Sequence, residues 1–93
     1  MEEKILTLHP EGKNGVNISL EKYNKVKDFI LDMTSCNGTI SYKELDLIAR
    51  ENLGPVFDGS VSWYLVSVKL DLEARGIIER VKQKGGHAIK LKN

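Results

Sequence analysis

The chain has 93 residues, of which 41% are hydrophobic and 29% are charged, a composition that excludes a disordered chain and fits one small globular domain. The absence of a long apolar run excludes a membrane span, and the acidic start MEEKILTLHP is unlike a secretory signal, so we expect a cytoplasmic protein with no membrane partner. One cysteine, Cys36, excludes an internal disulfide and any multi-cysteine zinc site.

The net charge of +1 hides an uneven distribution along the chain. Residues 77–93 contain five basic side chains and one acidic side chain, a local charge of +4. The remaining residues must therefore sum to −3. Positive charge is concentrated at the C-terminal end, where a phosphate-bearing partner would be attracted.

The N-terminal segment predicts one short strand over residues 3–9, because Leu6 and Leu8 share a face across one intervening residue. Proline and glycine between residues 10 and 15 then indicate a loop. Residues 15–19 fit either a second short strand or the approach to a helix. The sequence leaves open whether the N-terminal strand pairs within the chain or across a dimer.

Three helices follow, because apolar residues recur at steps of three and four and a serine precedes each run. A strand-like bridge at residues 39–40 separates the first helix from the second. Serine side chains cap open backbone N–H groups at a helix start, and turn residues or glycine end each run. The predicted helices cover residues 20–34, 42–52 and 61–75, with caps at Ser19, Ser41 and Ser60.

The C-terminal runs IIERVK and HAIKLK flank a glycine pair, which predicts a β-hairpin over residues 77–92. A strand, three helices and a hairpin form an α+β domain that spans residues 1–93. This order resembles the winged helix-turn-helix superfamily, in which the hairpin is the wing. The most specific stretch is LDLEARGIIERV, which resembles the junction of recognition helix and wing through Leu72, Gly76, Ile77, Ile78, Glu79 and Arg80. The chain also resembles a small prokaryotic family of this fold that carries no settled activity.

The resemblance implies that the third helix enters a DNA major groove and that the wing contacts the backbone or the minor groove. We therefore expect a small regulator that binds double-stranded DNA. Polar residues of the third helix would approach bases: Ser62, Ser67 and Lys69. Alternation along the hairpin predicts that its cations point one way and its apolar side chains the other. The cations expected to contact phosphate are Arg80, Lys82, Lys84, Lys90 and Lys92. Alternatively, these lysines protect a solvated edge strand from aggregation, and acidic residues in the second helix count against tight binding.

The third helix is apolar on two sides, which favours a different function. One stripe faces a core and consists of Val61, Leu65, Val68 and Leu72. The opposite side holds Trp63, Val66, Leu70 and Ala74. If this apolar face were left in water, it would form a patch that needs a partner. Either the N-terminal segment or a second copy of the chain is expected to lie across it. In this alternative the protein is an interaction module whose homodimer interface contains Trp63, Val66 and Leu70.

Catalysis has no positive signal in the sequence. No serine lies in a nucleophile elbow, and no glycine-rich stretch is followed by the lysine and hydroxyl of a phosphate loop. His9 and His87 share no ligand spacing, so no metal site and no cofactor are expected. Asp71 is predicted to pair with Arg75, four residues later on the same helix, and Glu73 is predicted to be solvated.

Overall fold

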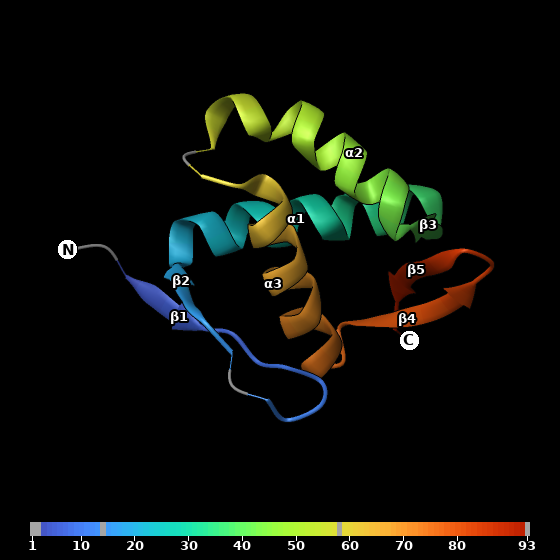
Figure 1. Cartoon of the computed structure of the whole chain (residues 1–93), viewed down its shortest axis with the longest axis horizontal. Helices are drawn as coiled ribbons and strands as arrows, with labels where there is room; N and C mark the ends of the chain where they lie inside the picture. The colour runs from blue at the N-terminus through green and yellow to red at the C-terminus, as the bar shows by residue number, and fades with distance from the viewer. Residues whose placement is uncertain (1–2, 14, 58, 93) are drawn as a thin grey trace.

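The computed structural model describes residues 3–13, 15–57 and 59–92 (Figure 1). Within these residues the chain is α+β, with three α-helices, one 3-10 turn and five strands in two antiparallel sheets. The elements are β1 (Lys4–Leu6), β2 (Asn17–Ser19), α1 (Leu20–Asn37), β3 (Thr39–Ser41), α2 (Tyr42–Asn52), the 3-10 helix Gly54–Val56, α3 (Val61–Ala74), β4 (Ile78–Gln83) and β5 (Gly86–Leu91). Three helices followed by a hairpin have the winged-helix-like layout that the sequence predicts.

Serine hydroxyls cap all three helices, as the sequence predicts. Ser19, Ser41 and Ser60 each accept a hydrogen bond from the backbone N–H three residues later. The bounds of α2 match the prediction, and those of α3 differ by one residue. The predicted end of the first helix at residue 34 is wrong, because α1 continues to Asn37. Gly38, with φ of 73°, ends it and donates its N–H to the Thr34 carbonyl over 2.9 Å.

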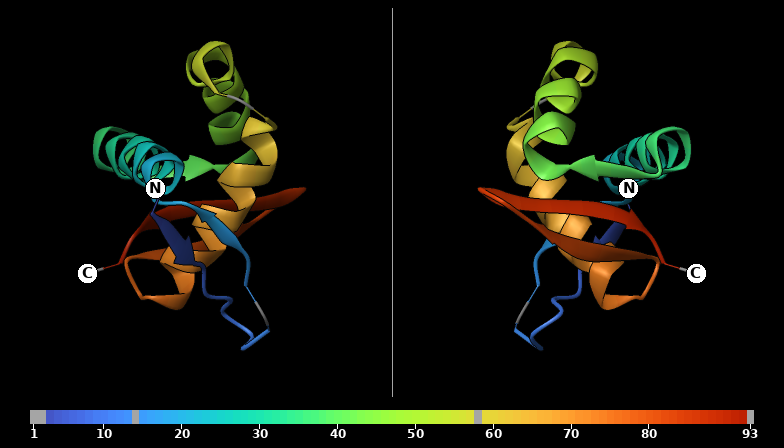
Figure 2. Two further views of the ribbon diagram at one scale, coloured as in Figure 1. Left: turned by 90° about the vertical axis from the view of Figure 1, so that its left-hand side faces the viewer. Right: turned by 90° about the vertical axis from the view of Figure 1, so that its right-hand side faces the viewer.

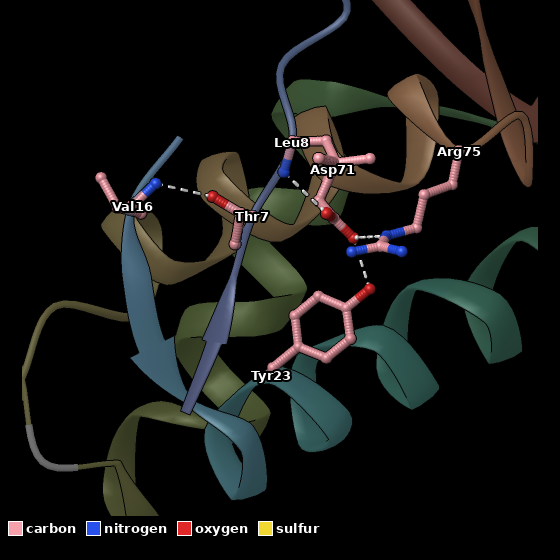
Figure 3. Close-up of polar contacts among 6 residues, drawn as sticks. All are labelled: Thr7, Leu8, Val16, Tyr23, Asp71 and Arg75. Atoms are coloured by element: carbon pink, nitrogen blue, oxygen red, sulfur yellow. Dashed lines mark hydrogen bonds and ion pairs between the residues drawn. The ribbon is translucent and has the colours of Figure 1, made fainter. Parts of the chain in front are cut away.

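The N-terminal strand pairs within the chain. Ile5 of β1 lies opposite Ile18 of β2 in an antiparallel ladder, so residues 15–19 supply the second strand. The predicted strand over residues 3–9 is shorter than expected, because ladder pairing ends at Leu6. Beyond it, Thr7 and Val16 exchange two hydrogen bonds of 2.9 Å that keep the loop ends together (Figure 3).

The second sheet has the strand order β3-β5-β4, so the central strand belongs to the C-terminal hairpin. In both side views, α1 and α2 lie above this hairpin (Figure 2). The core lies between the helices and the sheet, where burial of each large aliphatic side chain contributes about 1.5–3 kcal/mol. Its fully or almost fully buried members include Val26, Ile30, Ile40, Leu45, Leu65, Val68, Leu72, Ile78 and Ile89.

The prediction that one stripe of the third helix faces the core is confirmed. Val61, Leu65, Val68 and Leu72 are all buried in α3, at no more than 6% exposure. The wing turns through two residues, since Gln83 pairs with Gly86. Gly85, with φ of 81°, supplies the left-handed conformation that such a tight turn needs.

Gly15 is required by the close approach of the residue after β1, Thr7, to the segment that leads into β2. A Cβ atom at this position would lie 1.7 Å from the Thr7 carbonyl oxygen. We predict that Gly15→Ala lowers the free energy of unfolding by about 1–3 kcal/mol, because the backbone must separate to admit the methyl group. Urea denaturation followed by circular dichroism would measure the loss.

Gly86→Ala is the matched control, because a Cβ there would meet nothing within 4 Å. It should change the free energy of unfolding by less than about 1 kcal/mol. Equal destabilisation by the two substitutions would contradict the steric explanation.

Candidate nucleic-acid interface

The three residues of α3 that were expected to approach bases are differently placed. Ser62 donates a hydrogen bond of 2.8 Å to the Asp46 carboxylate of α2, so its hydroxyl holds two helices together. Ser67 is partly exposed on the flank of α3. Lys69 is only 3% exposed. The expectation that Lys69 reaches a base is therefore incompatible with its burial.

Lys69 is the only cation of α3, and its charge is satisfied inside the protein. Its Nζ lies 3.6 Å from the Glu73 carboxylate and 5.2 Å from the centre of the Tyr42 ring. Burial lowers the pKa of Lys69, and the Glu73 carboxylate opposes this effect. The Glu73 side chain is 10% exposed, so the prediction that it is solvated is wrong. Glu73 follows Lys69 by one turn of α3, so both side chains lie in the same enclosed space.

Asp71 lies on the other flank of α3 and is completely buried (Figure 3). One carboxylate oxygen accepts from the backbone N–H of Leu8 over 2.8 Å. The other accepts from the Tyr23 hydroxyl of α1 and, over 2.8 Å, from Nε of Arg75. The predicted pair with Arg75 is confirmed, with the carboxylate completely buried and the Arg75 side chain 36% exposed. Burial, and secondarily Asp71, raises the pKa of Tyr23 to about 12, so this phenol remains a hydrogen-bond donor.

The wing cations do not share one side of the hairpin. Cross-strand partners lie on the same face of an antiparallel pair. Arg80 lies opposite buried Ile89, and Lys82 lies opposite His87, so these cations share the face that packs on the helices. Lys90 lies opposite Glu79 on the other face and bonds to its carboxylate over 3.2 Å. The predicted separation of cations from apolar side chains is therefore wrong.

The position of β4 at the edge of the sheet explains the mixed faces. Ile89 of the central strand β5 and Ile78 at the start of β4 cover the hydrophobic interior, whereas Arg80 and Lys82 of the edge strand are exposed on the same face. All five predicted phosphate ligands are exposed: Arg80, Lys82, Lys84, Lys90 and Lys92. Of these, Lys90 is already paired with a carboxylate.

A hollow of about 330 Å³ separates the wing turn from the start of α2. We call it the wing hollow, and its lining consists of Ser41, Tyr42, Lys43, Gln83, Lys84, Gly85, Gly86 and His87. Figure 1 shows the start of α2 beside β5, which brings these distant segments together. Two exposed lysines from separate elements, Lys43 and Lys84, therefore line one hollow.

The floor of the wing hollow contains an aromatic pair. The rings of Tyr42 and His87 are stacked, with centroids 5.1 Å apart and planes inclined by 17°. Burial raises the pKa of Tyr42 to about 12, so this phenol is neutral at physiological pH. Since Lys69 lies over the same Tyr42 ring, the stack connects the wing to α3.

The second apolar side of α3 is covered only in part. We call Trp63, Val66, Leu70 and Ala74 the outward face of α3. Trp63 is 45% exposed and Val66 is 37% exposed, whereas Leu70 and Ala74 are half-buried. Leu70 lines a hollow with residues 9–11, and Ala74 lines another with residues 6–10. The N-terminal segment therefore shields the C-terminal half of this face and leaves the other half open.

Sequence reasoning singled out neither Lys43 nor His87 as a site residue. Lys43 comes two residues after the capping Ser41, so the sequence does predict that it lies in the first turn of a helix. Its proximity to the wing turn depends on how α2 meets β5, a contact between residues more than forty positions apart. Among the described residues, no group of three metal-ligating side chains comes together.

The buried pair of Lys69 and Glu73 gives a test of this interior. We predict that Lys69→Met lowers the free energy of unfolding by about 2–4 kcal/mol, because it leaves the Glu73 carboxylate buried without its cation. The double variant Lys69→Met with Glu73→Leu should recover most of that loss. Urea denaturation of both single variants and the double variant completes the cycle. A double variant whose free energy of unfolding falls by the sum of the two single losses would contradict the pairing of Lys69 with Glu73.

Comparison with known proteins gives a family but no activity. No curated protein and no solved structure matches the chain. The likeness to winged-helix proteins therefore rests on the layout of its elements. In the part of the chain that the structure describes, no helix is long and apolar enough to cross a membrane. A family model matches residues 4–88, and the chain therefore belongs to the family of unknown function DUF6958.

Proposed function

We propose that this protein is a nucleic-acid-binding module that contacts the phosphate backbone of double-stranded DNA through the wing and the start of α2. The observation that carries the proposal is the wing hollow, whose lining includes Lys43 of α2 and Lys84 of the wing turn. Lys82 and Arg80 extend the positive charge along β4. Cations that converge from several elements are what a phosphate contact requires, because release of counterions supplies most non-specific affinity.

In this proposal α3 does not read bases in a major groove. Groove-reading side chains are usually Arg, Lys, Asn, Gln or Ser. The outward face of α3 offers an indole and aliphatic groups, Lys69 is buried, and Ser62 is bonded to Asp46. The expected contact is therefore with backbone and not with sequence, which gives modest affinity and little discrimination between duplexes.

The acidic balance of α2 is a smaller obstacle than the sequence suggests. Asp46 accepts from Nε of Arg50 over 3.2 Å and from Ser62, so part of its charge is neutralised on the protein. Glu44 and Glu51 are exposed. The proposal restricts the phosphate contact to Lys43 in the first turn of α2; the neighbouring Glu44 of that turn does not line the wing hollow.

We predict that a fluorescent 20-base-pair duplex binds at low salt and dissociates as salt rises. Each phosphate that is neutralised contributes about 0.9 to the slope of log K against log salt. Lys43→Gln and Lys84→Gln should each reduce this slope by about 1. Fluorescence anisotropy over a salt series would measure the slopes.

Lys25→Gln is the control, because Lys25 lies on α1 and is paired with Glu21 over 3.4 Å. It should leave the slope unchanged. An absence of binding at low salt, or an equal loss in the control, would contradict the proposed function.

A protein interface on the outward face of α3 is a second candidate, favoured by the exposure of Trp63 and Val66. Leu6 and Leu8 are also exposed and line one hollow with Ala74, so the apolar surface extends from α3 to the N-terminal segment. Exposed apolar surface of this kind is commonly covered by a partner, and a homodimer is the simplest one.

Sedimentation velocity would test this second candidate. If the face is a homodimer interface, Trp63→Ala should weaken self-association by about tenfold or more, because aromatic anchors dominate such interfaces. Leu47→Ala is the matched control, since Leu47 is 51% exposed on α2 and is not part of the outward face of α3. A wild-type protein that remains monomeric at all accessible concentrations would exclude the homodimer.

A further inference from the structure

His87 is a titratable group that lines the wing hollow, and the proposed phosphate contact gives it no role. It is half-buried on β5, stacked on Tyr42 and directly opposite Lys82 in the hairpin register. Its Nε2 is buried and has no hydrogen-bond partner among the described residues. An imidazole that faces a cationic hollow, with one nitrogen unsatisfied, can change its charge when the electrostatics of the hollow change.

The groups that face His87 come from every element packed against it. From α2 come the neutral phenol of Tyr42 and the ammonium of Lys43. From α3 come Lys69 and the Glu73 carboxylate that is paired with it. The wing contributes three cations: Arg80, Lys82 and Lys84. Cations outnumber carboxylates around this ring, so a further positive charge is disfavoured while the hollow holds no anion.

The pKa of His87 agrees with that geometry. Burial lowers it, and the charges of Lys69 and Arg80 lower it further. All three causes act against the imidazolium form. Only burial would persist if a negative group entered the hollow and balanced the cations.

We propose that His87 takes up a proton when a phosphate group enters the wing hollow, so that phosphate binding tightens as the pH falls. This inference rests on the proposed phosphate contact and adds its regulation. The bound phosphate oxyanion offsets the surrounding cations, and the imidazolium then adds an attraction of its own. Protonation and phosphate binding therefore support each other by the same factor in both directions.

The sign of the effect follows from linkage. Phosphate raises the pKa of His87 in the complex above its value in the free protein. The gain in affinity is complete below the pKa of the free protein, and it is lost as the pH rises through the pKa of the complex. Since the pKa of free His87 lies below the ordinary histidine value of 6.5, the gain in affinity becomes complete only below pH 6.5.

The test measures duplex affinity by anisotropy at four pH values from about 5.5 to 8.5, at constant ionic strength. We expect the wild type to bind about tenfold more tightly at the lowest pH than at the highest, which is the effect of a shift of one pKa unit. His87→Phe keeps an aromatic ring on Tyr42 but cannot be protonated. The affinity of this variant for the duplex should therefore not increase as the pH falls. His9→Gln removes the other histidine of the chain and should behave like the wild type.

A second measurement does not depend on DNA. The chemical shifts of the His87 ring protons would be followed by NMR as the pH is varied, with and without inorganic phosphate. A higher pKa of His87 in phosphate supports the inference, and an unchanged pKa overturns it. Binding of the duplex by His87→Phe with the wild-type pH profile also overturns the inference but leaves the proposed function intact. Failure of the wild type to bind any duplex refutes the proposed function, while the phosphate titration still tests His87.

Discussion

The buried carboxylate of Asp71 is the contact on which the arrangement of this domain depends. It receives a backbone N–H of Leu8, the hydroxyl of Tyr23 and the guanidinium of Arg75, so one side chain joins the N-terminal segment and α1 to α3. A carboxylate out of water is costly unless charged and neutral donors saturate it. Here two oxygens accept three donors, and the charge of Arg75, itself partly exposed, balances that of the carboxylate.

The position of Asp71 also decides which surfaces remain available. Because it fixes Leu8 against one flank of α3, the loop that follows reaches Leu70 and Ala74 but stops short of Trp63. The opposite flank is closed by Lys69 and Glu73 under the Tyr42 ring. Both flanks in the middle of α3 therefore make contacts inside the protein, through Asp71 on one flank and through Lys69 and Glu73 on the other. What remains open is an apolar patch at its start and a cationic hollow at the wing.

The sequence predicts the architecture of this domain well, because helix periods, serine caps and a glycine turn are local signals. It also predicts the buried stripe of α3, since a core face repeats every three to four residues. The sequence does not predict which residues are buried at the flanks of that helix. Asp71 and Lys69 sit between the two apolar stripes, and such residues are solvated unless another element covers them. Whether Leu8 or Tyr42 lies there depends on contacts between distant segments, which periodicity does not encode.

The wing shows a second kind of limit. Alternation correctly predicts a hairpin, but it does not say which strand lies at the edge of the sheet. Arg80 and Ile89 share a face because they are cross-strand partners, yet only Ile89, on the central strand, is buried. The wing hollow is also invisible in the sequence, since Lys43 and Lys84 are forty-one positions apart. Its existence follows from the packing of α2 against β5 alone.

The placement of the single indole has a practical consequence. Trp63 is the only tryptophan of the chain, and it lies edge-on to Tyr64 at the start of α3 with nearly half of its surface in water. The wing hollow contains no indole. Intrinsic emission therefore reports whether the outward face of α3 becomes covered, with little response to events at the wing. A blue shift would signal association of that face, while a ligand at the other end of the molecule would leave the spectrum in place.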